Sequence, residues 1–354
     1  MDRCEPANRC RRSAMEHHGN DPRDVITPIR NAALLIGGAC LSVSVLGCTS
    51  MDAADQPKSQ SSESSTISAL PDPTPFTVEE YEPVAELKQA AVDFLESALT
   101  VDANDAAIPS RERVPPELAS DTAFDDLAPL LGDNAISTEV VYPQLGGLTR
   151  TKASIIALVD TQRFENQQIV RTTRVLDLRL TRSDGKWTVT AVKSTGGNLK
   201  GSGPTQPTDS SEPSSELVAQ VLEDDNIALT DTSIQDLLEG DIDARVLEVV
   251  RGFARDHQLS VAVLRTGHPR DVFGTDRQSN HTRGKAVDIW EIDGKPVSYY
   301  AQQSADDNPA RALMEAALAD GSDEVGGPWA FATRDGATFS NIVHQDHIHI
   351  GYEN

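Results

Sequence analysis

The chain has 354 residues, with 31 Lys and Arg against 55 Asp and Glu, which gives a formal net charge of -24 at pH 7. Roughly 100–200 residues make one domain, so this length leaves room for about two. A strongly negative chain repels nucleic-acid phosphates and anionic lipid headgroups, so charge alone argues against both as partners.

The amino terminus has the pattern of a secretory signal. Arg23 and Arg30 precede an apolar run at residues 32–46. This run is too short for a membrane-spanning helix but fits the hydrophobic region of a signal peptide. The run ends in Val45-Leu46-Gly47-Cys48, which resembles a bacterial lipobox and implies that Cys48 is lipidated. We therefore expect residues 1–47 to be a lipoprotein signal segment. The alternative is a buried hydrophobic helix that happens to end at Cys48.

Residues 48–75 favour the lipoprotein interpretation. They are rich in Ser, Asp, Gln and Pro, a composition that cannot bury enough apolar surface to fold. We expect a disordered tether, and an extracytoplasmic protein that meets the bacterial membrane only through its lipid anchor. All four cysteines lie in the first 48 residues, so no disulfide framework is expected in the folded parts.

Residues 76–200 are expected to form an α+β domain. Val84, Leu87, Ala91, Leu95 and Ala98 recur at helical spacing, which predicts a helix near 80–99. Strand-like runs follow at 154–164, 176–180 and 187–191, and an Asp-Gly pair between the last two predicts a hairpin. A helix followed by an antiparallel meander resembles the nuclear-transport-factor-2-like class in architecture. The domain has no histidine and no evident catalytic cluster, so a spacer or docking role is favoured.

A Pro/Gly/Ser-rich linker is expected at 201–215, followed by a second α+β domain at 216–354. Asp243 is a candidate helix cap, and Asn308-Pro309 is expected to open another helix that Gly321 closes. Strands are expected at the ranges 259–264, 286–290 and 348–352.

The residues with metal-binding chemistry cluster in this second domain. A strand places residues i and i+2 on one face, so His347 and His349 are expected to point the same way. Some 60 residues earlier, Gly284 allows the backbone to turn so that His281 returns beside Asp288. Two histidines and one aspartate would fill three corners of a tetrahedral zinc and leave one for water, which is typical of a catalytic site.

The motif Ser-x-His-x-x-Gly-x-Ala-x-Asp is matched here at every fixed position, by Ser279, His281, Gly284, Ala286 and Asp288. With the late His-x-His it resembles the zinc peptidases that cleave bacterial cell-wall peptides: D-alanyl-D-alanine carboxypeptidases, murein endopeptidases and the lysostaphin-like, hedgehog-type enzymes. The resemblance spans residues 259–352, about a quarter of the chain. It implies a zinc-peptidase-like antiparallel sheet with flanking helices, Zn²⁺ held by His281, Asp288 and His349, and peptidoglycan stem peptides as substrates.

The resemblance leaves the proton-transfer group open. The carboxypeptidase branch has a glutamate three residues before the last ligand, where this chain has Asp346. The murein-endopeptidase branch has histidines at the positions of His344 and His347. We predict His347 as the proton-transfer residue, with Asp346 as second choice or as the partner that orients a histidine. His344 is predicted to stabilise the developing oxyanion.

Substrate recognition departs from the family pattern. Where these peptidases have Ser-Gly-Tyr-Arg, this chain has Thr266-Gly267-His268-Pro269-Arg270, with the arginine displaced by one position. Arg270 and Ser279 are the predicted substrate-binding residues, with Arg265 as an alternative to Arg270.

Three functions fit the sequence. The leading hypothesis is a membrane-anchored zinc hydrolase of peptidoglycan stem peptides, of the D,D-carboxypeptidase or endopeptidase type. The second is a catalytically inactive zinc-fold lipoprotein that binds or organises the cell wall, which the atypical motif and the missing glutamate favour. The third is a structural zinc domain in which His344 or His268 closes the fourth corner.

Overall fold

The computed structural model describes residues 70–101, 108, 110–131, 135–165, 168–197, 213–333 and 337–353. The predicted signal segment, Cys48, the tether up to position 69 and most of the predicted linker lie outside these residues. Below, residues 70–197 are called the amino-terminal half and residues 213–353 the carboxy-terminal half; both belong to one compact unit. Among the described residues, no helix is both long and apolar enough to cross a membrane.

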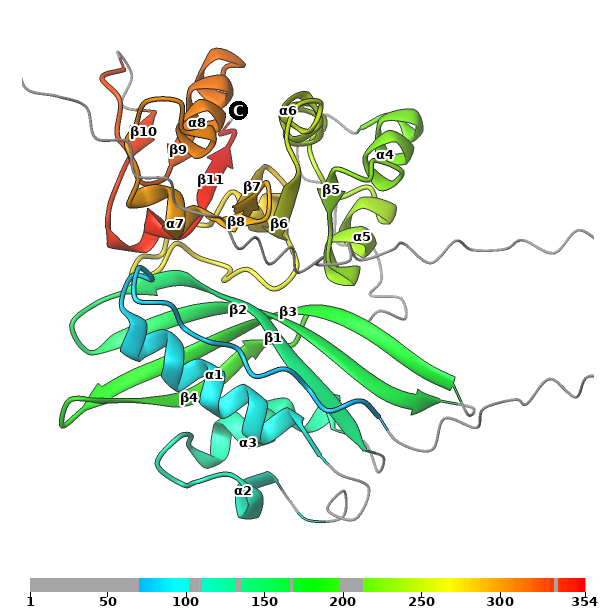
Figure 1. The fold of residues 1–354 in the computed structure, drawn as a ribbon, viewed down its shortest axis with the longest axis vertical. Coiled ribbons are helices and arrows are strands. Elements are labelled where there is room, and N and C mark those ends of the chain that lie inside the picture. The colour runs from blue at the N-terminus through cyan, green and yellow to red at the C-terminus, as the bar shows by residue number, and fades with distance from the viewer. Residues whose placement is uncertain are drawn as a thin grey trace, which may run out of the picture. The chain divides into compact units, whose positions relative to one another are not determined.

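The amino-terminal half is a four-stranded antiparallel sheet with helices on one face (Figure 1). Its elements are α1 (Ala85–Leu99), α2 (Ser110–Arg113), α3 (Asp121–Leu127), η1 (Ala128–Leu130), β1 (Ile136–Leu148), β2 (Lys152–Glu165), β3 (Gln168–Ser183) and β4 (Lys186–Ser194). The predicted helix and the last three strands are confirmed. The helix begins later than expected, after Val84, whose φ of +53° is not helical. Strand β1 and the short helices were not predicted.

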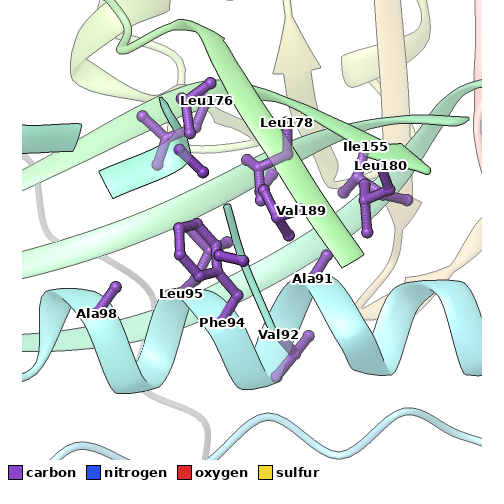
Figure 2. Packing of buried hydrophobic residues seen from close by; sticks show 14 of the residues in the cluster. Ala91, Val92, Phe94, Leu95, Ala98, Ile155, Leu176, Leu178, Leu180 and Val189 are labelled. Carbon is purple, nitrogen blue, oxygen red and sulfur yellow. The ribbon is translucent and has the colours of Figure 1, made fainter. Parts of the chain in front are cut away.

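The sheet is buried on both faces, as the alternation along β2 shows. Ile155, Ala157 and Val159 belong to a core shared with α1 and the other strands, and Figure 2 shows α1 side chains facing β3 and β4. Ile156 and Leu158, which point the other way, belong to a second cluster. The nearly continuous apolar run of β2 therefore reflects burial from both sides.

The carboxy-terminal half is a mixed sheet with the strand order β10-β9-β11-β7-β6-β5, and β8 pairs with β7. Its elements are α4 (Ser215–Leu222), β5 (Ile227–Ala228), α5 (Asp231–Leu238), α6 (Ala244–Ala254), β6 (Leu259–Val263), η2 (His281–Arg283), β7 (Ala286–Ile292), β8 (Lys295–Pro296), α7 (Val297–Ala301), α8 (Pro309–Ala319), β9 (Glu324–Gly326), β10 (Thr338–Phe339), η3 (Ile342–Gln345) and β11 (Ile348–Gly351). The overall class is α+β, as predicted.

The expectation of a purely antiparallel sheet is wrong at the two edges of this sheet. The pairs β5/β6 and β9/β10 are parallel, while β6/β7, β7/β11 and β11/β9 are antiparallel. Parallel neighbours need a long connection between them, and α5 with α6 provides it between β5 and β6. The predicted caps are confirmed: the Asp243 carboxylate accepts from Arg245 N, and the Asn308 side chain accepts from Ala310 N and Arg311 N.

The two halves pack against each other through the second face of the four-stranded sheet. Its cluster joins Ile156, Leu158 and Val175 to Ala262 and Val263 of β6. The ring of Tyr142 stacks on that of Trp290 at 4.4 Å between centroids. This contact, which the sequence did not predict, brings the end of β1 beside the histidine cluster of the other half.

Candidate metal centre

The two sequence motifs meet through the pairing of β7 with β11. His349 and Asp288 are direct register partners in this antiparallel pair, although 61 residues separate them in the chain. Side chains of register partners project from the same face of a sheet. The sheet therefore brings the last histidine of one motif against the last aspartate of the other.

His281 reaches the same point from a tight loop. The short helix η2 ends at Gly284, whose φ of +69° is a left-handed conformation that glycine adopts without strain. A Cβ at this position would lie 1.7 Å from the backbone oxygen of Asp241, so the loop also passes close to another backbone segment. Both requirements explain why a glycine stands between His281 and β7.

Gly284→Ala is therefore expected to lower the free energy of unfolding by about 2–4 kcal/mol, because strain at positive φ adds to a backbone clash. Gly274→Ala is the matched control: its φ is +78°, but nothing lies within 4 Å of an added Cβ. Thermal denaturation of both variants measures the difference. Equal losses of stability would show that the close approach to Asp241 is unimportant.

Three ligand-type atoms converge at the meeting point. His281 Nε2 lies 3.0 Å from Asp288 Oδ1 and 3.1 Å from His349 Nδ1, and His349 Nδ1 lies 2.9 Å from Asp288 Oδ1. The His281 and Asp288 side chains are almost completely buried. Ligand atoms around a tetrahedral zinc at the usual bond lengths lie about 3.3 Å apart, so this triangle is close to the size that zinc requires.

The contacts of the two rings show which nitrogen of each histidine faces the meeting point. His281 Nδ1 donates to the carbonyl oxygen of Leu264 at 2.8 Å, which leaves Nε2 as the nitrogen that faces the other two atoms. His349 Nε2 lies 3.6 Å from a carboxylate oxygen of Glu324, which favours the proton on Nε2 and the lone pair on Nδ1. A proton or a cation shared among the three atoms accounts for distances this short.

The charges around the centre shift the pKa values of Asp288 and His349. Burial would raise the pKa of Asp288, but His281 and His347 hold it well below its usual value, so the carboxylate is ionised. Burial would lower the pKa of His349, but Asp288 and Glu324 raise it to about 9. The two carboxylates therefore favour a positive charge at His349.

His268 also belongs to this neighbourhood. His268, His281 and Asp288 form a group that can hold a metal ion, with one ligand atom of each residue within 4.8 Å of the others. However, the rings of His268 and His281 are stacked at 4.1 Å and 16°. An imidazole lone pair lies in the plane of its ring, so a cation in the plane of His281 lies well outside the plane of His268. The trio with His349 has the shorter distances, and we favour it as the ligand set.

His347 and Asp346 form a pair beside the trio. His347 Nδ1 lies 2.7 Å from Asp346 Oδ1, and His347 Nε2 lies 3.8 Å from Asp288 Oδ2. Burial would raise the pKa of Asp346, but the Lys88 ammonium and His347 hold it below its usual value. The ionised carboxylate accepts the Nδ1 proton of His347, and His347 Nε2 faces Asp288.

Two other predicted site residues, Ser279 and His344, line the central cavity. Ser279 is buried in the wall of the cavity at the centre, and its Oγ accepts from His281 N at 3.2 Å. His344 lines the same cavity, and its Nδ1 lies 2.9 Å from Asn341 Oδ1. Burial, and then His347 and His349, hold the pKa of His344 well below its usual value, so its ring is neutral. The Nδ1 hydrogen of His344 is taken up by Asn341 Oδ1.

The predicted substrate-binding arginines do not line the central cavity. The Arg270 side chain is 81% exposed and lines a neighbouring cavity. Arg265 pairs with Asp241. The arginine that does line the central cavity is Arg277, which also pairs with Glu324 at 2.9 Å.

The central cavity has a volume of about 490 Å³ and walls from both halves. Its polar lining includes Asp288, His344, His347 and His349, and its apolar lining includes Leu145, Leu148, Ile156, Phe273 and Phe339. The residues that sequence reasoning missed come from the amino-terminal half. Gln144 Nε2 donates to Asp288 Oδ2 at 2.6 Å, and Lys88 Nζ lies 2.6 Å from Asp346 Oδ2. No local pattern marks either residue, because each gains its role only from a contact distant in sequence.

Comparisons with known proteins add little to this geometry. A scan with protein-family models and a search of curated proteins both give no match. One solved structure, of an IcmL-like type IV secretion system protein from Legionella pneumophila, is similar at 17% identity over 35% of this chain and 96% of that chain, with a TM-score of 0.27. A likeness this low supports no conclusion about the fold or function of this chain.

Proposed function

We propose that this chain is a zinc-dependent hydrolase of peptidoglycan stem peptides, of the D,D-carboxypeptidase or endopeptidase type. We propose further that Cys48 carries a lipid that holds the enzyme at the extracytoplasmic face of the bacterial membrane. The observation that carries the proposal is the convergence of His281 Nε2, Asp288 Oδ1 and His349 Nδ1 at 2.9–3.1 Å from one another. The motif resemblance to zinc peptidases of the cell wall supports the substrate class.

The residues present fit zinc. Two imidazoles and one carboxylate are among its usual ligands, and the contact of His281 with the Leu264 carbonyl is the type of bond that orients zinc-binding histidines. His281, Asp288 and His349 would hold the ion. Bound there, zinc supplies Lewis-acid chemistry that polarises a carbonyl group and makes a nearby water more acidic.

His347 and Asp346 would carry out the proton transfer that hydrolysis requires. His347 accepts a proton at Nε2 from water as the new C–O bond forms, and the Asp346 carboxylate stabilises the resulting imidazolium through Nδ1. The same nitrogen then returns the proton to the amine nitrogen as the C–N bond breaks. Asp346 serves as the orienting partner in this scheme, because Lys88 and His347 engage both of its oxygens.

The cavity suits a peptide with small apolar side chains. Its lining combines apolar side chains with polar groups that can meet the peptide backbone, among them Asn280 and Asn341. Arg277 is the cation best placed to meet a substrate carboxylate in this cavity. This assignment replaces the predicted role of Arg270, whose exposed side chain lines the neighbouring cavity.

An inactive zinc-fold lipoprotein is the second candidate, which the atypical Thr266–Arg270 segment favours. Incubating the zinc-loaded protein with purified muropeptides distinguishes the hydrolase from the inactive binding protein. We expect release of D-alanine or cleavage of cross-linked peptides, detected by mass spectrometry, and no product from the chelated protein. Absence of product at every pH from about 5 to 9 would exclude the hydrolase and leave the binding protein.

A further inference from the structure

The contacts of Gln144 and Lys88 extend the site into the amino-terminal half. We propose that this half is a working part of the metal centre, in which Gln144 positions the ligand Asp288 and Lys88 positions Asp346 and through it His347. The inference rests on the proposed function. It assigns a role to a half of the molecule that the sequence marks only as a spacer or docking module.

Gln144 fixes which oxygen of Asp288 faces the ligand trio. Its Nε2 donates to Oδ2 at 2.6 Å, while Oδ1 faces the two ligand nitrogens. The Gln144 side chain is fully buried, and its Oε1 has no hydrogen-bond partner among the described residues. Turning the amide over would place that oxygen against a carboxylate, so repulsion holds Nε2 on Asp288. Burying an amide oxygen without a hydrogen-bond partner costs stability. We infer that Gln144 is kept at this position because it orients Asp288.

Lys88 acts from helix α1. The side chain is fully buried, with Nζ 2.6 Å from Asp346 Oδ2 and 2.5 Å from Glu82 Oε2. The backbone N–H of Leu145 in β1 also donates to Asp346 Oδ2, at 2.9 Å. With Oδ2 held by these two donors, Oδ1 is left to accept from His347 Nδ1 at 2.7 Å. The Asp346 carboxylate is thus held by α1 and β1, and it in turn orients the ring of His347.

The surrounding polar groups explain why a charged lysine is stable there. Glu82 also receives hydrogen bonds from Tyr142, at 3.1 Å to Oε2, and from Ser298, at 2.6 Å to Oε1. Tyr142 comes from β1 and Ser298 from α7 of the other half, so this network crosses the contact between the halves. Separating the halves would remove Lys88 and the Leu145 N–H from Asp346, and Ser298 from Glu82, which disfavours independent movement of the halves.

Two variants of the full-length protein test the two contacts separately. Gln144→Leu is expected to weaken zinc binding by about 10–100-fold, as loss of an orienting partner does elsewhere, measured by competition with a chelator. Gln89→Leu is the matched control, because Gln89 bonds only Asp93 within α1 among the described residues. Zinc affinity equal to that of the parent in Gln144→Leu would remove Gln144 from the site.

Lys88→Met is expected to lower kcat by about tenfold or more, with KM and zinc content unchanged, because His347 loses its orientation and the ligands do not. Leu87→Ala in the same helix is the control for a general loss of stability, and it should leave kcat unchanged where both variants are folded. Lys88→Met/Glu82→Gln removes one charge of each sign and gives the same test if the single variant does not fold.

The outcomes separate this inference from the proposed function. A parent-like kcat in both Lys88 variants would remove Lys88 from the site, while the parent enzyme remains a zinc hydrolase. A parent protein that takes up no zinc or cleaves no peptide would overturn the proposed function and this inference together.

Discussion

His347→Asn should lower kcat on muropeptides by about 100–10,000-fold, the usual contribution of a positioned general base. Asparagine places an N–H where His347 Nδ1 now bonds Asp346, so the hydrogen bond at 2.7 Å can persist. What is lost is the Nε2 lone pair near Asp288. KM and zinc content should therefore stay close to those of the parent, because the ligand trio and the other residues of the cavity wall are unchanged.

His257→Asn is the matched control for this prediction, since His257 pairs with Asp293 and neither residue lines the central cavity or its neighbour. Its kcat should equal that of the parent. The same substitution at His344 tests the competing assignment, because His344 occupies the other histidine position of the murein-endopeptidase pattern. A larger loss at position 344 than at 347 would transfer the proton-transfer role to His344.

His281→Ala should abolish tight zinc binding, with a loss of affinity greater than about 100-fold, because it removes a ligand rather than a partner that orients one. Zinc content after dialysis and a competition titration measure the effect. The same loss is expected for His349→Ala. His268→Ala should retain zinc, because the ring of His268 is stacked on that of His281 and does not present its lone pair to the same point.

This comparison decides between the two histidine trios around Asp288. Loss of zinc in His268→Ala together with retention in His349→Ala would favour the group of His268, His281 and Asp288. Loss in both variants would indicate four protein ligands and a closed structural site, which would remove the open position that hydrolysis requires.

Much of the candidate site could be predicted from the sequence, because its signals are local. His281, Gly284 and Asp288 lie within one loop and the start of one strand, where residue type and spacing limit the geometry. The alternation of a strand indicated the face of His349. The pairing of β7 with β11, which places His349 opposite Asp288, was implied only by the resemblance to zinc peptidases.

The contribution of the amino-terminal half could not be predicted in this way. Lys88 follows Leu87 in an amphipathic helix, where a lysine is ordinarily solvated, and its burial depends on ion pairs with Glu82 and with the distant Asp346. Gln144 lies in β1, whose mixed run of polar and apolar residues gives no clear alternation. Both residues gain their roles from contacts across 144 or more positions of the chain.

The departure from Ser-Gly-Tyr-Arg also has a structural account. Thr266 bonds the buried Asp236 through both its backbone N–H and its hydroxyl. Gly267 has a φ of +97°, and an added Cβ would lie 2.6 Å from the side chain of Val175 in the amino-terminal half. The segment is therefore fitted to the contact between the halves, and His268 stacks on a ligand ring.

The most direct test of this account is a crystal structure of the zinc-loaded protein with anomalous data collected at the zinc edge. We expect one strong peak within about 2.0–2.2 Å of His281 Nε2, Asp288 Oδ1 and His349 Nδ1, with the fourth position facing the cavity. A peak bound by His268 in place of His349, or no peak at these residues, would contradict it.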